Sequence, residues 1–262
     1  MRIDSRCRFR YHEASDASCL ARNETMNLIL LFPEDDLAPG VVRLSGRRML
    51  HVLAVQRAEV GDRLRIGRID GKIGSGEITS VTASAIELRI TLSESPPPAL
   101  PVRLVLALPR PKMLKRVLIS AVSMGVKQIH LVHSFRVEKS FWKSPLLQPE
   151  KLAEPVILGL EQARDTVLPV IRQHPLFKPF VEDELPALVE GSLPLVAHPG
   201  GEQACPAAVA EPVTLAIGPE GGFIPYEIDK LLDCGFRPFH FGPRILRVET
   251  AVPALLSRFM KE

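Results

Sequence analysis

The sequence predicts an α/β protein in which a parallel sheet with flanking helices follows a small N-terminal β domain. Between residues 26 and 93 only short runs of strand character recur, with turn residues between them. After residue 100, apolar strand-like runs alternate with helix-like runs, which is typical of βαβ units. Between the two lies Pro96-Pro97-Pro98, and consecutive prolines form a stiff spacer, so we expect a linker over 94–100.

The composition is that of an ordinary globular protein, with 46% hydrophobic and 24% charged residues and a net charge of +3. None of the four cysteines forms a Cys-x-x-Cys pair or has a histidine at zinc-finger spacing. No apolar run reaches transmembrane length. We therefore expect a reduced, cytoplasmic protein without a metal site. The cysteines are Cys7, Cys19, Cys205 and Cys234.

The first 25 residues show no hydrophobic periodicity and mix arginine with small polar residues. We expect a disordered extension over 1–25. Met26 begins the first patterned segment, and one hypothesis is that translation starts there.

The β domain is predicted over 26–93. Asp70-Gly71, between two runs of strand character, is a good hairpin signal, and Gly61-Asp62 marks another turn. Apolar residues at helical spacing predict a helix over 45–57, with Ser45 as a possible cap. Strands are expected at 27–32, 63–69, 76–81 and 85–92.

Arginine is concentrated in this domain. Residues 41–70 contain seven arginines against Glu59, Asp62 and Asp70, which is a local surplus of four positive charges. Such a patch is compatible with a phosphate-bearing partner and equally with a solvated basic face. The arginines are Arg43, Arg47, Arg48, Arg57, Arg63, Arg65 and Arg68.

In the second domain, glycine and proline mark the ends of the helices. Gly125 and Gly235 are natural stops, and Pro225 suits a first turn. Pro155 is expected to kink or interrupt its helix, and Pro253 is tolerable only in a first turn. Strands are expected at 102–108, 128–133, 169–172, 193–197, 213–217 and 239–241, and helices at 112–124, 149–164, 226–234 and 249–260.

Three glycine-containing loops follow strands of the predicted parallel sheet, at 198–201, 218–223 and 242–246. Ligands of open α/β sheets bind at the carboxyl ends of strands, and glycine lets the backbone approach a ligand closely. Each loop alone is explained by a tight turn. Three loops in one half of the domain favour a shared pocket.

The common nucleotide and hydrolase fingerprints are absent. The chain has no Gly-x-x-x-x-Gly-Lys-Ser/Thr phosphate loop, no Gly-x-Gly-x-x-Gly dinucleotide motif and no Gly-x-Ser-x-Gly elbow. Spacing alone therefore indicates only a small ligand in a glycine-lined pocket.

Two motifs carry a resemblance that goes further. Ile217-Gly218-Pro219-Glu220-Gly221-Gly222-Phe223 and Leu246-Arg247-Val248-Glu249-Thr250-Ala251 together resemble the signature of the ribosomal RNA small subunit methyltransferase E family. The resemblance extends over 26–262. It implies a PUA-like RNA-binding β-barrel over 26–93 and, over 101–262, a SPOUT methyltransferase domain that ends in a deep trefoil knot.

The implied activity is methylation of N3 of a uridine in 16S rRNA of the small ribosomal subunit, with S-adenosyl-L-methionine as cofactor and a homodimer as the working form. The alternatives are an RNA-binding protein that keeps the cofactor pocket but has lost activity, and a metabolic enzyme that binds another adenine ligand.

The resemblance also implies site residues. Because methylation removes the N3 proton, an arginine beside the uracil oxygens would stabilise the developing charge, and the candidates are Arg247, Arg164 and Arg136. Glu220 or Glu249 would accept the proton, or would cap a helix or pair with an arginine. The expected cofactor-binding residues are Leu195, Ala197, His198, Ile217, Gly218, Gly221, Gly222, Gly242, Ile245 and Leu246.

The RNA contacts are expected on the β-barrel. Arginine and histidine there would contact phosphates, although His51 alone is better explained by packing in a helix. The candidates are Arg43, Arg47, Arg48, His51 and Arg57.

Overall fold

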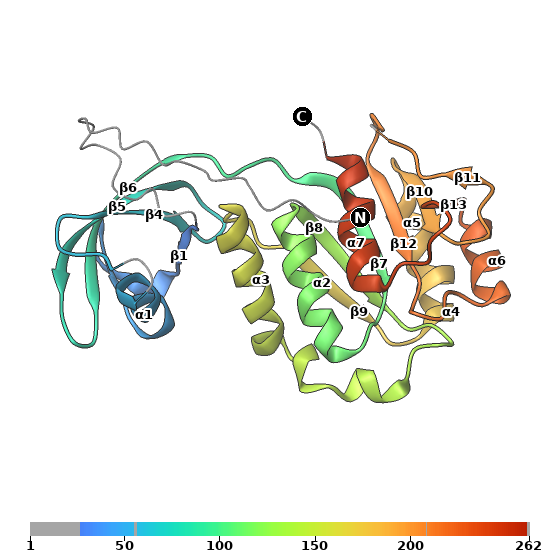
Figure 1. Ribbon diagram of the computed structural model, residues 1–262, viewed down its shortest axis with the longest axis horizontal. Coiled ribbons are helices and arrows are strands. Elements are labelled where there is room, and N and C mark those ends of the chain that lie inside the picture. The colour runs from blue at the N-terminus through green and yellow to red at the C-terminus, as the bar shows by residue number, and fades with distance from the viewer. Residues whose placement is uncertain (1–26, 55–56, 208, 261–262) are drawn as a thin grey trace, which may run out of the picture.

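The computed structural model describes residues 27–54, 57–207 and 209–260, which form two domains joined side by side (Figure 1). The extension predicted over 1–25 lies outside these described residues. Within them, no helix is long and apolar enough to cross a membrane.

The N-terminal domain is one curled sheet with strand order β1-β4-β5-β6-β3-β2. The β1–β4 pair is parallel and the other pairs are antiparallel. The sheet wraps around buried side chains that include Leu31, Leu64, Ile66 and Leu88. Its elements are β1 Ile29–Leu31, β2 Asp36–Ala38, β3 Val41–Leu44, α1 Gly46–Ala54, β4 Arg63–Arg68, β5 Ile73–Val81 and β6 Ile86–Glu94.

The predicted hairpin at Asp70-Gly71 is confirmed. Asp70 has φ of 52° and Gly71 N–H donates to the Arg68 carbonyl at 2.8 Å, which closes the turn between β4 and β5. The sequence pattern missed β2 and β3, which form one end of the sheet. The sheet has β1 at one end and β2 at the other, so the predicted barrel is an open half-barrel.

The C-terminal domain contains a seven-stranded sheet of order β11-β13-β10-β12-β7-β8-β9, in which every pair is parallel. This confirms the predicted α/β class. Helices α2, α3 and α7 lie on one face of the sheet, with α2 in contact with the other two (Figure 1).

The elements of this domain are β7 Leu100–Ala107, α2 Pro111–Ser123, β8 Val126–Val132, α3 Pro149–Ala163, β9 Val170–His174, α4 Phe177–Pro179, α5 Leu185–Val189, β10 Leu193–Ala197, β11 Gln203–Ala204, β12 Val213–Ile217, α6 Pro225–Asp233, β13 Arg237–His240 and α7 Val248–Leu256.

Along the sheet, the last strand β13 lies on one side of β10 and β12, and the last helix α7 lies on the other. β13 pairs with β10 and β11, yet α7 packs on α2, and the turn Ser257–Phe259 after it reaches β7. The chain therefore crosses back past the ends of β10 and β12 before α7 begins. The knot implied by the resemblance, which needs the chain to thread through a loop as well, stays a prediction.

The interruption predicted at Pro155 and the limit placed on Pro253 are both wrong. α3 runs without interruption from Pro149 to Ala163 and contains Pro155, which is buried. α7 contains Pro253 as its sixth residue, beyond the first turn. An internal proline costs about 3 kcal/mol in an isolated helix. Each of these helices buries several apolar side chains, and that packing offsets the cost.

The turn between α3 and β9 holds the N-terminal domain. Thr166 accepts the Asp70 N–H at its carbonyl (2.8 Å) and donates its hydroxyl to the Gly71 carbonyl (2.6 Å). Leu28 N–H donates to the Glu161 carbonyl at 2.9 Å. Since the turn precedes β9, the half-barrel is fixed at the amino edge of the parallel sheet.

Gly159 permits the close crossing of α3 over α2. A Cβ there would lie 2.8 Å from Val122 Cβ and 2.9 Å from the Ile119 carbonyl oxygen. We expect Gly159→Ala to lower the melting temperature, because overpacking costs about 1–3 kcal/mol and the gain in helix propensity is about 1 kcal/mol. Thermal denaturation measures this, with Lys151→Ala on the exposed side of the same helix as control. A Gly159→Ala protein as stable as the wild type would contradict this account of the crossing.

Candidate functional site

A cavity of about 340 Å³ opens at the carboxyl ends of β10, β12 and β13. We call it the first cavity. Register brings these strand ends together, since Ala197 aligns with both Ile217 and Phe239. The loop over 241–247 and the start of α7 close the cavity. Its lining is Ala197, His198, Pro199, Ile217, Gly218, Pro219, Glu220, Gly222, Phe239, Phe241, Gly242, Pro243, Arg244, Ile245, Leu246, Val248, Ala251 and Leu255.

Glycine is required in the loop after β12 and in the loop after β13. Gly222 and Gly242 have φ of 75° and 84°, in the left-handed region that disfavours side chains. A Cβ on Gly218 would lie 3.1 Å from the backbone nitrogen of Phe223, because the 218–223 loop folds back on itself. The glycines thus expose backbone groups to the cavity.

Two histidines each fix a turn by accepting a hydrogen bond from the backbone N–H two residues later. His198 Nδ1 accepts from Gly200 N–H, and His240 Nδ1 accepts from Gly242 N–H, both at 3.1 Å. Gly201 packs directly on β13, where a Cβ would lie 2.6 Å from the Phe239 carbonyl carbon. His198 therefore both lines the cavity and fixes a turn.

A second cavity of about 460 Å³ adjoins the first. It lies between the start of α2 and the start of α7 and is lined by Arg110, Lys112, Met113, Glu220, Ile245, Leu246, Arg247 and Glu249. Glu220, Ile245 and Leu246 line both cavities, so the two spaces share a wall.

The second cavity contains charges of both signs. Arg110 forms an ion pair with Glu220 at 3.5 Å, and both side chains are largely exposed. Arg247 stands at the position preceding α7. Glu249 Oε2 is buried and has no hydrogen-bond partner among the described residues. An unsatisfied buried acceptor costs about 1–3 kcal/mol, so a donor brought by a ligand would be favourable here.

A third carboxylate, Glu227, organises the loops around the cavities. Its side chain is 2% exposed and accepts from Ser134 Oγ at 3.1 Å, Phe135 N–H at 2.7 Å and Ile224 N–H at 3.0 Å. The loop after β8 is thereby tied to the loop before α6. Sequence reasoning missed Glu227, although a glutamate at the third position of a helix is a known capping signal.

Arg136 completes this connection. Its guanidinium donates to the Gly221 carbonyl, and a Cβ on Gly221 would lie 2.8 Å from Arg136 Cδ. Gly221 therefore faces the loop after β8, which explains why it does not line the first cavity.

Eight of the ten expected cofactor-binding residues line the first cavity; Leu195 and Gly221 do not. Leu195 lies within β10 and is 3% exposed, in the core. The sequence pattern did not reveal the contribution of β13 and of α7, which includes Phe239, Val248 and Leu255. The helical spacing of 248, 251 and 255 was the available signal.

The structure brings together four of the five catalytic candidates. Arg247, Glu220 and Glu249 line the second cavity, and Arg136 holds the adjoining loop. Arg164 is elsewhere: it ends α3 with φ of 53°, next to Asp165, which pairs with Lys127 at the start of β8. It lies at the amino edge of the sheet, opposite the cavities, and the catalytic role predicted for it is not supported.

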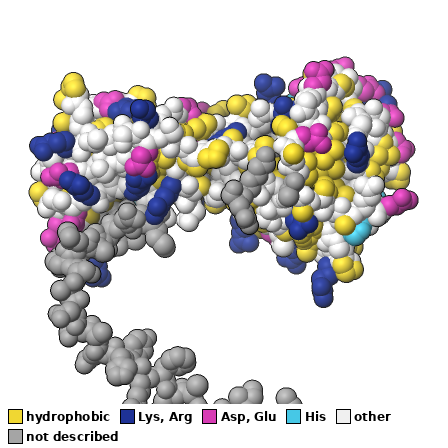
Figure 2. Space-filling view, turned by 90° about the horizontal axis from the view of Figure 1, so that it is seen from above, with side chains coloured by type: hydrophobic (Ala, Val, Ile, Leu, Met, Phe, Trp, Pro, Cys, Tyr) yellow, Lys and Arg dark blue, Asp and Glu magenta, His cyan; other side chains and the backbone are white. Residues whose placement is uncertain are grey.

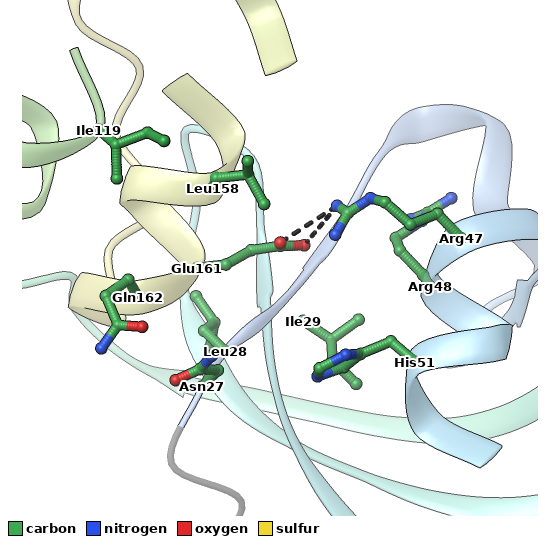
Figure 3. A pocket seen from close by; sticks show the side chains of 10 residues that line it. All are labelled: Asn27, Leu28, Ile29, Arg47, Arg48, His51, Ile119, Leu158, Glu161 and Gln162. Atoms are coloured by element: carbon green, nitrogen blue, oxygen red, sulfur yellow. Dashed lines mark hydrogen bonds and ion pairs between the residues drawn. The ribbon is translucent and has the colours of Figure 1, made fainter. Parts of the chain in front are cut away.

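The RNA-binding candidates lie on the half-barrel, and two of them make contacts within the protein. Arg47 Nη2 donates to both oxygens of Glu161 at 3.1 Å, across the junction of the domains (Figure 3). Arg48 forms a buried ion pair with Asp35 and lies 5.0 Å from the Phe32 ring centroid. Arg48 is thus a core residue rather than a free phosphate ligand.

The remaining candidates have different settings. Arg43 pairs with Glu87 at 2.8 Å on the surface. A third pocket lies at the junction of the two domains (Figure 3). His51 is half-buried and lines this pocket together with Arg47. Arg57 is exposed, with φ of 49°.

Five of the seven arginines in residues 41–70 form ion pairs, so the predicted basic patch is largely neutralised. Figure 2 shows acidic and basic side chains interspersed on this lobe. Every acidic partner lies outside residues 41–70. The pairs are Arg43–Glu87, Arg47–Glu161, Arg48–Asp35, Arg65–Glu94 and Arg68–Asp36.

Comparison with known proteins identifies relatives of the chain. A family model described as an RNA methyltransferase domain matches residues 96–260. The Ribosomal RNA small subunit methyltransferase E of Treponema pallidum is 31% identical over 233 residues, which are 86% of this chain and 88% of the relative.

Solved structures have the same fold. A methyltransferase from Legionella pneumophila with the cofactor SAM bound is 26% identical, with a TM-score of 0.68 and coverage of 87% of this chain and 95% of the other. A Ribosomal RNA small subunit methyltransferase E from Neisseria gonorrhoeae, bound to S-adenosyl methionine, gives a TM-score of 0.67 at 21% identity, over 89% of this chain and 96% of the other.

The placement of Arg48 predicts a stability effect. Arg48→Ala leaves the Asp35 carboxylate buried without its cation, and we expect the free energy of unfolding to fall by about 3–5 kcal/mol. Arg43→Ala breaks a pair whose side chains are 51% and 34% exposed, and it should cost about 0–1 kcal/mol. Urea denaturation measures both, and equal losses would show that Arg48 is not a core residue.

Proposed function

The chain belongs to the ribosomal RNA small subunit methyltransferase E family, and from this membership we propose that it methylates N3 of a uridine in 16S rRNA, using S-adenosyl-L-methionine. The observation that carries the proposal is the shared wall between the two cavities. A methyl donor held in the first cavity and a base held in the second meet at Glu220, Ile245 and Leu246.

The first cavity suits an adenosyl group. Ile217, Val248 and Leu255 provide apolar walls for a flat ring, and the loops at Gly218 and Gly242 bring backbone groups to its edge. When bound, S-adenosylmethionine supplies a methyl group that is already activated by its sulfonium. The task of the protein is therefore mainly to position the acceptor nitrogen in line with that methyl group.

The second cavity suits the base. As N3 loses its proton, negative charge spreads over the two uracil oxygens, and the guanidinium of Arg247 stabilises it. Arg110, held by Glu220 at 3.5 Å, adds positive charge on the other side of the cavity.

Glu249 is the better proton acceptor of the two glutamates. One of its carboxylate oxygens is buried without a partner among the described residues, whereas Glu220 is paired with Arg110 and its side chain is 47% exposed. In this role Glu249 would take the N3 proton, which would leave the nitrogen free to accept the methyl group that S-adenosylmethionine supplies.

The homodimer expected from the resemblance stays a prediction. Phe241 and Ile245, at the rim of the first cavity, are 39% and 83% exposed in the single chain. A second copy of the chain is one partner that would cover them.

The activity is tested with small ribosomal subunits from a strain that lacks this modification. We expect the purified chain to transfer about one methyl group per 16S rRNA, with N3-methyluridine recovered after digestion; subunits that already carry the modification are the control. Binding of S-adenosylmethionine, followed by calorimetry, without transfer would instead favour an inactive RNA-binding protein. Absence of cofactor binding would reject the methyltransferase assignment.

The roles of Arg247 and Glu249 predict kinetic effects. Arg247→Ala and Glu249→Gln should each lower kcat about 100-fold or more, while the Kd for S-adenosylmethionine, measured by calorimetry, changes little. Glu150→Gln, an exposed carboxylate at the start of α3, is the matched control. Full activity in Glu249→Gln would remove Glu249 as the proton acceptor.

A further inference from the structure

Phe135 is an aromatic side chain that the protein leaves in water. It is 76% exposed, in the loop that follows β8. Six of the other described phenylalanines, in contrast, are at most 9% exposed: Phe177, Phe180, Phe223, Phe236, Phe239 and Phe259. A single exposed apolar residue is common on protein surfaces, so exposure alone assigns no role.

The backbone that carries Phe135 is firmly held. Its N–H donates to the buried Glu227 carboxylate at 2.7 Å, and the residues on either side of the turn, Ser134 and Val137, are 0% and 4% exposed. Val137 N–H donates to the Ser134 carbonyl at 2.9 Å. The ring therefore projects from a rigid turn, which lowers the entropy cost of binding a partner.

A second hydrogen bond fixes the start of the same loop. Trp142 Nε1 donates to His133 Nδ1 at 3.0 Å, so this ring nitrogen carries no proton. Burial lowers the pKa of His133, which favours that neutral form. The turn is thus held at both His133 and Glu227.

Phe135 stands beside the proposed methylation site. The next residue, Arg136, lies on Gly221, whose neighbours Glu220 and Gly222 line the cavities. β7 and β8 are adjacent parallel strands (Figure 1), so Arg110 after β7 and Lys112 in the first turn of α2 lie at the same edge. The ring is therefore at the rim of the site where RNA must arrive.

The loop that carries the ring is rich in exposed positive charge. Arg136, Lys139 and Lys143 are exposed in the same loop, against Glu138 alone. An exposed aromatic ring with cations on the same loop differs from the continuous apolar surface that two copies of a protein bury against each other. It matches the chemistry of unpaired RNA, in which bases stack on aromatic rings and phosphates bind lysine and arginine.

From this arrangement we propose that Phe135 is a stacking platform for an unpaired base of 16S rRNA next to the methylated uridine, and that Lys139 and Lys143 bind the adjoining phosphates. This inference rests on the proposed function, because it places the same RNA on the rim of the same cavities. It adds RNA contacts at the carboxyl edge of the sheet to those predicted on the half-barrel.

The test compares Phe135→Ala with Phe135→Trp, which keeps a stacking surface. For Phe135→Ala we expect the KM for small ribosomal subunits to rise about tenfold, with kcat and the Kd for S-adenosylmethionine nearly unchanged, and for Phe135→Trp we expect recovery. Leu50→Ala, at an exposed apolar position on the half-barrel, is the control. An unchanged KM in Phe135→Ala overturns the proposal.

A binding measurement separates this proposal from the activity itself. Fluorescence anisotropy with a single-stranded RNA oligonucleotide, without cofactor, should show weaker binding for Phe135→Ala even if no methyl transfer occurs. For Lys139→Gln with Lys143→Gln, the slope of log K against log salt should fall by about 0.7 for each phosphate that the protein no longer binds. If Phe135→Ala instead weakens self-association in sedimentation and leaves RNA binding intact, the ring belongs to a protein interface and the proposal fails.

Discussion

The buried carboxylate of Glu227 holds the functional edge of the molecule together. A charge with 2% exposure is tolerable only if donors surround it, and here a hydroxyl and two backbone N–H groups do so at the positive end of α6. Those donors come from the loop after β8 and the loop after β12, which are far apart in the chain but adjacent at the sheet edge. Because one side chain joins both loops, the position of Arg136 against Gly221, and with it the Glu220 wall of both cavities, depends on it.

The return of the chain from β13 to α7 makes the two cavities neighbours. The residues of this return, 241–247, line the first cavity on one side and the second on the other. Glycine at 242 with φ of 84° gives the bend, and the packing of Val252, Leu255 and Leu256 holds α7 despite its internal proline. The same packing that fixes the last helix therefore sets the distance between the two cavities.

Much of this follows from local pattern, and the failures share a cause. The alternation of strand and helix and the hairpin at Asp70-Gly71 could be predicted because they depend on residues close in sequence. Most of the first cavity could be predicted for other reasons: three glycine-containing loops follow parallel strands, and the motif resemblance implied the residues. The arginine patch was misjudged because its acidic partners, such as Glu161 for Arg47, lie outside the stretch in which charges were counted. Glu227 was missed because its partners Ser134 and Phe135 come from another strand end. The position of Arg164, away from the cavities of the same chain, could not be predicted because sequence does not say at which edge of a sheet a helix ends.

The positions of the two domains restrict how closely the half-barrel can approach the cavities of the same chain. It is fixed at the amino edge of the sheet through Thr166 and Asp70, whereas the cavities open at the carboxyl edge. Strands of five to eight residues separate these edges, which at roughly 3.3 Å per residue is about 15–25 Å. Arginines at that distance, most of them already paired with acids, can hold a long RNA but cannot orient one base to within the fraction of an ångström that methyl transfer needs. Under the proposed function that precision comes from groups at the carboxyl edge, where Arg247 directly precedes α7, Arg136 donates to the Gly221 carbonyl and the Phe135 backbone donates to Glu227.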